Sequence, residues 1–167
     1  FLSNQYVRDF ITNVTTETAY EYDYTYLLPT SITTRNYNGT TSLINPVGTK
    51  VTNTIFENNS SGIGADYHIG RPLETSSTTS AYGGTSTSKE IFTYSGNKLT
   101  KTEKRGNTLD NKFLVEEFEY NNVGNVIKKT LSSSGYTPEE TFTPRVTEYT
   151  YDATERFVKT IKDIEGL

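Results

Sequence analysis

The chain has 167 residues, a formal net charge of −4 and no cysteine. Lack of cysteine excludes a disulfide scaffold and a zinc–thiolate site, and the acidic balance does not favour nucleic acid or an anionic membrane as a partner. Apolar residues make up 32%, against roughly 45–50% (glycine included) in ordinary globular domains, and no apolar run reaches the roughly 18 residues of a membrane span. Abundant Tyr, Phe and Thr form strands and argue against disorder, so we predict an all-β chain with little two-sided burial.

In chain order, residues 1–18 are predicted to be an irregular connecting strand. Apolar residues recur there at helical spacing, but the β-branched residues that follow argue against a helix. Residues 19–167 are assigned to one repeat segment of antiparallel β-hairpins. The hairpin candidates cover 19–37, 40–59, 91–104, 113–131 and 145–164, with Asn38-Gly39 as a two-residue turn. The Ser/Thr/Gly-rich stretch 76–88 is predicted to be a further strand pair that turns at Gly83-Gly84.

A degenerate motif recurs through the segment: two aromatic residues two positions apart, a turn residue, a short turn and a returning strand. Aligned on the second aromatic, five copies follow one another at steps of 34, 38, 26 and 31 residues. Residues two apart on a strand share a face, so each complete copy is expected to place two rings on one side of the sheet. The predicted structural positions are Tyr20, Tyr22, Asp23, Phe56, Phe92, Tyr94, Phe118, Tyr120, Gly124, Tyr149, Tyr151, Asp152, Arg156 and Gly166.

The motif suggests scaffold roles for its polar residues. Asp152 is expected to accept hydrogen bonds from backbone N–H groups of its turn, as Asp does in Asx-turns. Arg156 is then expected to reach Asp163 or an acid of a neighbouring repeat. Lys and Glu alternate in the second half of the chain, and we expect them to pair between neighbouring strands.

The order strand, Tyr-x-Tyr-Asp, turn, Gly-Arg, strand resembles the YD repeat of the Rhs (rearrangement hotspot) family. The matching segments are Tyr149–Gly166 and Phe118–Thr130, with Glu155 and Asn125 departing from the usual Gly and Arg; Tyr67–Pro72 resembles a segment found between repeats in bacterial members. The resemblance covers about residues 20–167. It implies a fragment of a longer chain whose sheet spirals into a hollow shell around a C-terminal effector, often a toxin. It also implies a bacterial protein that is secreted or displayed at the cell surface through secretion machinery, with this segment as wall and without an enzyme activity, cofactor or metal.

Two other classes remain as alternatives. A surface adhesin or carbohydrate-binding module would use an exposed ladder of rings, including Tyr20, Tyr22, Tyr24 and Tyr26 on one face. A glycosidase would need two carboxylates about 5–9.5 Å apart, for which Glu116, Glu117, Glu119, Glu139 and Glu140 qualify by identity alone. His68, the single histidine, cannot build a multi-histidine metal site, and we interpret it as structural.

Overall fold

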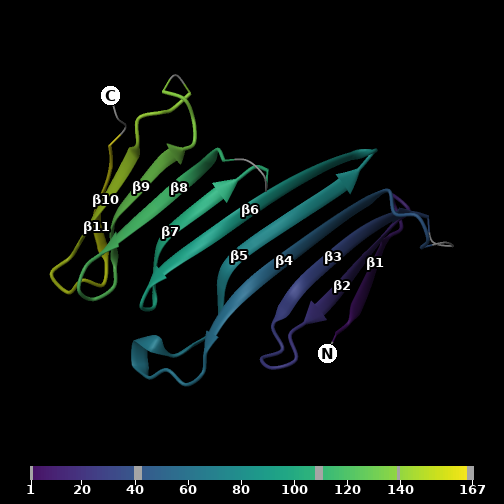
Figure 1. Ribbon diagram of the computed structural model, residues 1–167, viewed down its shortest axis with the longest axis horizontal. Helices are drawn as coiled ribbons and strands as arrows, with labels where there is room; N and C mark the ends of the chain where they lie inside the picture. The colour runs from purple at the N-terminus through teal and green to yellow at the C-terminus, as the bar shows by residue number, and fades with distance from the viewer. Residues whose placement is uncertain (1, 40–42, 108–110, 139, 165–167) are drawn as a thin grey trace.

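The computed structural model describes residues 2–39, 43–107, 111–138 and 140–164. Eleven strands and one short 3₁₀ helix, η1 (Gly64–Asp66), lie in this part of the chain (Figure 1). The strands are β1 (Asn4–Asp9), β2 (Val14–Tyr22), β3 (Pro29–Asn38), β4 (Gly48–Asn59), β5 (His68–Ala81), β6 (Gly84–Ser95), β7 (Lys98–Arg105), β8 (Phe113–Tyr120), β9 (Val126–Ser134), β10 (Arg145–Tyr151) and β11 (Val158–Ile164). No helix in the described residues is long and apolar enough to cross a membrane.

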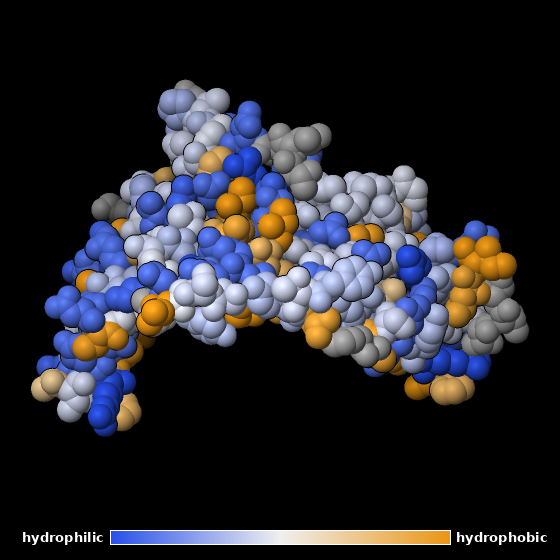
Figure 2. Space-filling view, turned by 60° about the horizontal axis from the view of Figure 1, so that its bottom comes forward, coloured by the Kyte–Doolittle hydropathy of each residue, from blue (hydrophilic) through white to orange (hydrophobic). Residues whose placement is uncertain are grey.

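The strands form one antiparallel meander, in which spatial order equals chain order from β1 to β11. The prediction of an all-β, hairpin-rich chain is therefore confirmed. The sheet is open and only gently arched, with β1 and β11 as its two edges (Figures 1 and 2). The Thr-rich strand pair that turns at Gly83-Gly84 is also confirmed, as the hairpin of β5 and β6.

The molecule is a single layer with almost no enclosed core. Its accessible surface is 11205 Å², against about 8,300 Å² expected of a compact monomer of 18.8 kDa. Among the described apolar residues only Tyr37 and Val115 are buried, and Figure 2 shows apolar side chains scattered among polar ones. Cross-strand pairs rather than a packed interior must therefore supply most of the stability.

Three local predictions are corrected. The stretch predicted to be an irregular strand contains a regular hairpin formed by β1 and the first part of β2, and the predicted boundary at 18/19 falls inside β2. Leu43 and Ile44, part of the first strand predicted within 40–59, are not in a strand. Asn38-Gly39 does not close a two-residue hairpin, because β3 ends at Asn38 and β4 begins only at Gly48. The predicted repeat position Gly166 lies outside the described residues.

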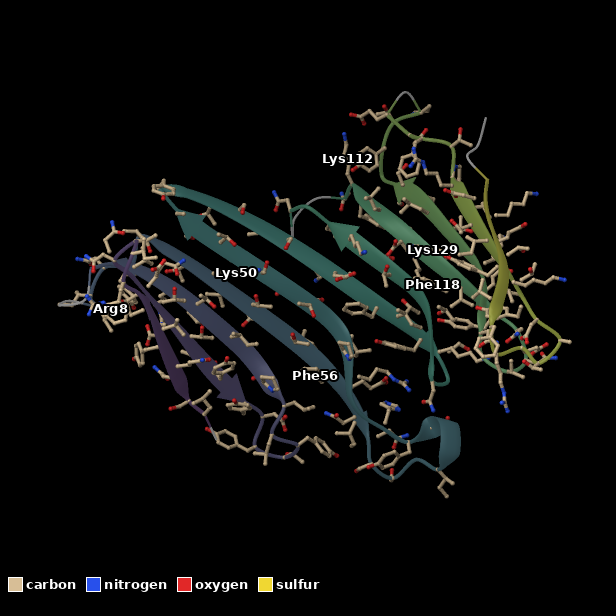
Figure 3. The ribbon with its side chains drawn as sticks, turned by 180° about the vertical axis from the view of Figure 1, so that it is seen from behind. Arg8, Lys50, Phe56, Lys112, Phe118 and Lys129 are labelled. Carbon is tan, nitrogen blue, oxygen red and sulfur yellow. The ribbon has the colours of Figure 1, made fainter. Side chains whose placement is uncertain are left out.

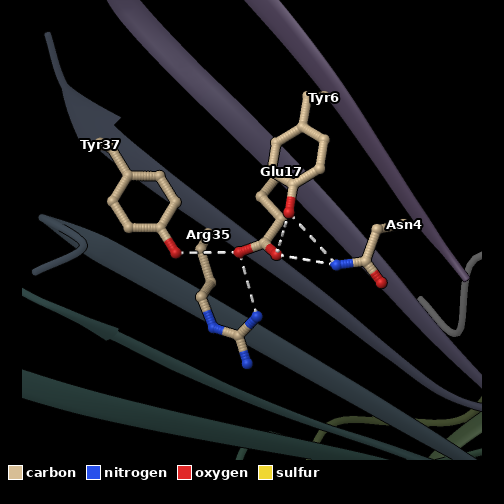
Figure 4. A network of polar contacts seen from close by, with 5 residues as sticks. All are labelled: Asn4, Tyr6, Glu17, Arg35 and Tyr37. Atoms are coloured by element: carbon tan, nitrogen blue, oxygen red, sulfur yellow. Dashed lines mark hydrogen bonds and ion pairs between the residues drawn. The ribbon is translucent and has the colours of Figure 1, made fainter. Parts of the chain in front are cut away.

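A polar network explains why the first hairpin is regular despite its poor apolar pattern. The buried carboxylate of Glu17 accepts hydrogen bonds from Asn4 Nδ2 and Tyr6 on β1, at 3.0 Å each (Figure 4). On β3 it accepts bonds from Tyr37, at 2.9 Å, and Arg35, at 3.2 Å. Tyr37 foremost, with Tyr6 and Arg35, lowers the pKa of Glu17. The four donors join three strands through this one side chain.

Candidate functional site: a laced edge of repeated turns

The five aligned aromatic residues occupy one repeated backbone position. At each of Tyr22, Phe56, Tyr94, Tyr120 and Tyr151, the pairing with the returning strand shifts by one residue, which marks a β-bulge. The returning strands carry the extra residue, which is Thr30, Leu73, Thr100, Ile127 or Lys159. Because these aromatics lie at or near the C-terminal ends of β2, β4, β6, β8 and β10, all five bulges lie at the same end of the sheet (Figure 1).

The ring pairs share one face, as the alternation predicts. Residues that pair directly across neighbouring strands lie on the same face of the sheet. Phe92 pairs with Thr102, and Thr102 with Glu116, which shares the face of Phe118 on β8. Phe118 pairs with Lys129, and Lys129 with Thr147, which shares the face of Tyr149 on β10. The pairings that start from Tyr20 and pass through β3, β4 and β5 also lead to the face of Phe92 on β6. The repeat rings are half-buried, since their side chains pack against neighbouring strands of this face.

Cations cover several of these rings. Arg71 lies 4.9 Å from the ring centre of Tyr94, and Lys98 lies 5.4 Å from that of Tyr120. Lys129 lies 6.0 Å from the ring of Phe118, beside it in Figure 3. A covered ring face is not available for stacking on a sugar.

The tyrosines of the first copy only partly form the predicted ladder. Tyr20 and Tyr22 stack with ring centres 6.3 Å apart on β2. Tyr24 and Tyr26 do not continue that face, because β2 ends at Tyr22 and both residues lie in the following turn. Tyr24 is fully exposed, and the hydroxyl of Tyr26 donates to Ser60 in the next turn.

In the first and fifth copies the Asp after the aromatic closes the turn, which confirms the Asx-type role predicted for Asp152. Asp152 Oδ1 accepts hydrogen bonds from the backbone N–H groups of Arg156 and Phe157, and its Oδ2 accepts one from Thr154. Asp23 accepts bonds from the N–H groups of Thr25, Tyr26 and Leu28. These donors, Thr154 first for Asp152 and Tyr26 first for Asp23, lower the pKa of both carboxyl groups.

The fourth copy uses an amide in the same way. Asn121 Oδ1 accepts a hydrogen bond from the N–H of Asn125, and the turn then passes through Gly124 at a φ of 96°, which favours glycine. An amide oxygen therefore replaces the carboxylate at this position of the repeat.

The hydroxyls of Tyr120 and Tyr151 reach back to the preceding repeat. Tyr120 donates to the carbonyl of Leu99 at 2.6 Å, and Tyr151 donates to the carbonyl of Val126 at 2.8 Å. Leu99 is the residue paired with Tyr94, and Val126 is the residue paired with Tyr120. Each hydroxyl therefore binds the backbone directly opposite the previous repeat aromatic, an arrangement that we call the tyrosine latch. Tyr22 makes the corresponding bond to Leu2, at 3.1 Å.

Side chains also join each turn to the next. Tyr26 donates to Ser60, and Arg71 donates to Asn97 at 2.7 Å. Lys98 donates to the carbonyl of Asn121 at 3.2 Å, and Asn125 Nδ2 donates to the carbonyl of Glu155 at 2.6 Å. We call this end of the sheet the laced edge; it comprises the turns 23–28, 60–67, 96–97, 121–125 and 152–157 and the residues that bridge them.

Away from the turns, opposite charges pair between strands, as predicted. Glu116 on β8 contacts Lys104 on β7 at 2.9 Å and Lys129 on β9 at 2.6 Å, and its side chain is only 15% exposed. Lys129 first, and then Lys104, lowers the pKa of Glu116 to about 2. A carboxyl group held ionised in this way cannot serve as the protonated acid of a glycosidase.

The other described carboxylates that were candidates for a glycosidase site are exposed or paired with a lysine. Glu119 is 60% exposed and pairs with Lys128 at 2.8 Å, and Glu140 pairs with Lys112. Glu117 is exposed, and Glu139 lies outside the described residues.

A shallow polar pocket of about 340 Å³ lies beside the second turn, where η1 interrupts the repeat. His68 Nε2 lies 3.2 Å from the carboxylate of Glu57, but neither ring nitrogen has a hydrogen-bond partner in the described part of the chain. Arg71 shares that carboxylate at 3.5 Å. Within the described residues no group of three His, Cys, Asp or Glu side chains is placed to hold a metal ion.

The laced edge includes residues that the motif did not identify. The bridging residues Arg71, Lys98 and Asn125 each come directly before the residue that pairs with their repeat aromatic. Because they follow that aromatic by 15, 4 and 5 residues, no fixed spacing in the sequence indicates them. Arg156 is exposed, and its backbone N–H rather than its guanidinium is the group that bonds Asp152. Asp163 accepts a hydrogen bond from Thr147, so the contact between Arg156 and an acid stays a prediction.

No protein-family model matches this chain, and the curated proteins contain no match.

Proposed function

We propose that this chain is a wall segment of a shell of the Rhs/YD-repeat type, which encloses a C-terminal effector of a secreted or surface-displayed bacterial protein. The observation that carries the proposal is the laced edge. Five bulges, each at an aligned aromatic, lie at one end of a single sheet, and successive turns are bonded side chain to backbone or side chain to side chain. A structural requirement repeats in this manner, whereas a catalytic site is usually made once.

The open, single-layer architecture supports the same function. A wall needs one continuous layer with two accessible faces, and this sheet exposes about a third more surface than a compact monomer of its mass. The chemistry of the described carboxylates gives no support to a hydrolase, because the pKa of Glu116 is lowered rather than raised. The cations over Tyr94, Tyr120 and Phe118 also count against a sugar-binding ladder at these rings.

The proposal is tested by limited proteolysis of the natural full-length protein that carries this segment, read by intact mass. We expect the repeat region to resist cleavage and a C-terminal fragment to be protected until a denaturant opens the wall. Free cleavage of the repeat region, with no protected fragment, would overturn encapsulation. Sugar binding at the exposed Tyr24 end would then be the next function to measure.

A matched pair of variants sharpens this experiment. Tyr120→Phe removes a latch of the laced edge, whereas Tyr24→Phe removes a hydroxyl that is fully exposed. We expect the protected fragment of the Tyr120→Phe protein to be cut sooner than that of the Tyr24→Phe protein. Equal rates of cleavage would show that the latch does not maintain the wall.

A further inference from the structure

The outer edge of β11 repeats the features of interior strands that bind a neighbour. Val158 is paired with Tyr151, just as Val126 is paired with Tyr120 and Leu99 with Tyr94. The carbonyls of Leu99 and Val126 each accept the hydroxyl of the following repeat tyrosine. Val158 therefore occupies the acceptor position of the latch at the edge of the sheet.

Side chains along β11 are more exposed than their counterparts on interior strands. Leu99 and Val126, the interior counterparts of Val158, are only partly exposed. At the edge, by contrast, Val158 is 48% exposed and Ile161 is 65% exposed, next to a Phe157 that is 71% exposed. Within the described residues, β11 pairs with β10 on one side and with no strand on the other.

We propose that the outer edge of β11 binds an antiparallel strand of the repeat's own chemistry, in which a tyrosine precedes Asp or Asn and donates its hydroxyl to the carbonyl of Val158. This inference rests on the proposed function, since it specifies how the wall continues. The register follows from β9 and β10, in which Glu148 lies opposite Lys128 and Arg145 opposite Leu131. If a strand like β10 paired with β11 in the same register, its residue equivalent to Glu148 would lie opposite Thr160. Its residue equivalent to Arg145 would lie opposite Asp163, and these two side chains carry opposite charges.

The other edge of the sheet has a different chemistry. In each latch the tyrosine hydroxyl points to the strand that precedes its own strand, from β10 to β9 and from β8 to β7. A strand added outside β1 would therefore direct its hydroxyl away from β1. The edge of β1 supports backbone pairing without a latch, which makes it the matched control.

The experiment uses disulfide trapping, because the chain has no cysteine of its own. The 167-residue chain carrying Thr160→Cys is equilibrated in a glutathione buffer with a peptide of residues 145–154 that carries Glu148→Cys. A second protein carries Val7→Cys, on the edge strand β1, where Val7 is 56% exposed. A second peptide adds Tyr151→Phe, and the fraction of mixed disulfide is read by intact mass.

We expect Thr160→Cys to capture the tyrosine peptide, and to capture the phenylalanine peptide roughly two- to tenfold less, the factor that one net hydrogen bond supplies. Val7→Cys should not distinguish the two peptides. Equal capture of both peptides at Thr160→Cys would overturn the latch, and no excess of capture over Val7→Cys would overturn the edge site. Disulfide trapping on the 167-residue chain tests the edge site and the latch, whereas proteolysis of the full-length protein tests encapsulation. The failure of one proposal can therefore be distinguished from the failure of the other.

Discussion

At the scale of the residue, the repeat tyrosine makes two interactions, one through its ring and one through its hydroxyl. A phenylalanine could make only the first. The tyrosine ring lies half-buried on one face of the sheet, with a cation over it in the case of Tyr120. Its hydroxyl donates to a backbone carbonyl of the preceding repeat. The side chain therefore connects neighbouring hairpins in a sheet that has almost no buried core to do so. Burial also raises the pKa of Tyr120, which keeps the phenol protonated and able to donate.

Tyr120→Phe and Tyr151→Phe should each lower the free energy of unfolding by about 1 kcal/mol, because each leaves a backbone carbonyl without its donor. Urea unfolding followed by circular dichroism measures this change. Tyr24→Phe, at a fully exposed position, should unfold at the same urea concentration as the unmodified chain. A loss in the Tyr24→Phe protein as large as in the latch variants would show that the hydroxyl bonds contribute nothing specific.

The ion pairs of Glu116 predict a dependence of stability on pH. Its pKa is about 2 in the folded chain and ordinarily 4.5, so the folded state binds the proton less tightly than the unfolded state. The ionised Glu116 therefore contributes about 1–3 kcal/mol to the free energy of unfolding. This contribution is complete above about pH 5 and is lost as the pH falls toward 2. Urea unfolding at pH 7 and pH 3 should show a smaller difference between the two pH values for Glu116→Gln than for the unmodified chain.

Glu119→Gln is the control for that experiment. Glu119 also pairs with a lysine, but its side chain is 60% exposed, and such surface pairs contribute about 0–1 kcal/mol. The Glu119→Gln protein should therefore keep the pH dependence of the unmodified chain. If Glu116→Gln keeps it as well, the acid sensitivity of the fold arises elsewhere.

At the scale of the element, three hairpins of the laced edge are closed by the residue after the repeat aromatic, which is Asp23, Asn121 or Asp152. Asp152 and Asn121 perform the same task, since each presents a side-chain oxygen to backbone N–H groups of its turn. Asp152→Ala removes that acceptor, whereas Asp152→Asn keeps it. We expect the urea midpoint to fall further for Asp152→Ala than for Asp152→Asn, with faster amide exchange in β10 and β11. The opposite order would mean that the charge, not the acceptor geometry, closes the turn.

The hairpins were predictable because their signals are local. Alternating aromatics followed by Asp or Asn indicated where β2, β8 and β10 end, and Gly83-Gly84 indicated the turn of β5 and β6. The bulges were not predictable, since the extra residue is Thr, Leu, Ile or Lys and has no common chemistry. The regular first hairpin was missed because Glu17 stabilises it through donors on β1 and β3, contacts that span up to 20 residues.

At the scale of the whole molecule, stability is distributed along the sheet rather than concentrated in a core. Each interior strand is hydrogen-bonded to the two strands that are its neighbours in sequence. Such quasi-one-dimensional architectures behave approximately as a sum of units and nearest-neighbour interfaces. A terminal hairpin should therefore be removable as a unit, whereas division of an interior hairpin should not be tolerated.

Two truncations test this view. A chain of residues 1–142 lacks β10 and β11 but keeps β8 and β9 together, so we expect it to stay folded, with an m-value lower roughly in proportion to the surface removed. A chain of residues 1–125 divides the hairpin of β8 and β9, which removes Lys129 from Glu116. It also uncovers Val115, one of the two apolar residues that are buried in the described part of the chain. This second chain should lose amide protection in β7 and β8 while β2–β5 stay protected. Loss of protection throughout the sheet in the 1–142 chain would instead indicate one cooperative unit, and the wall would then not be built hairpin by hairpin.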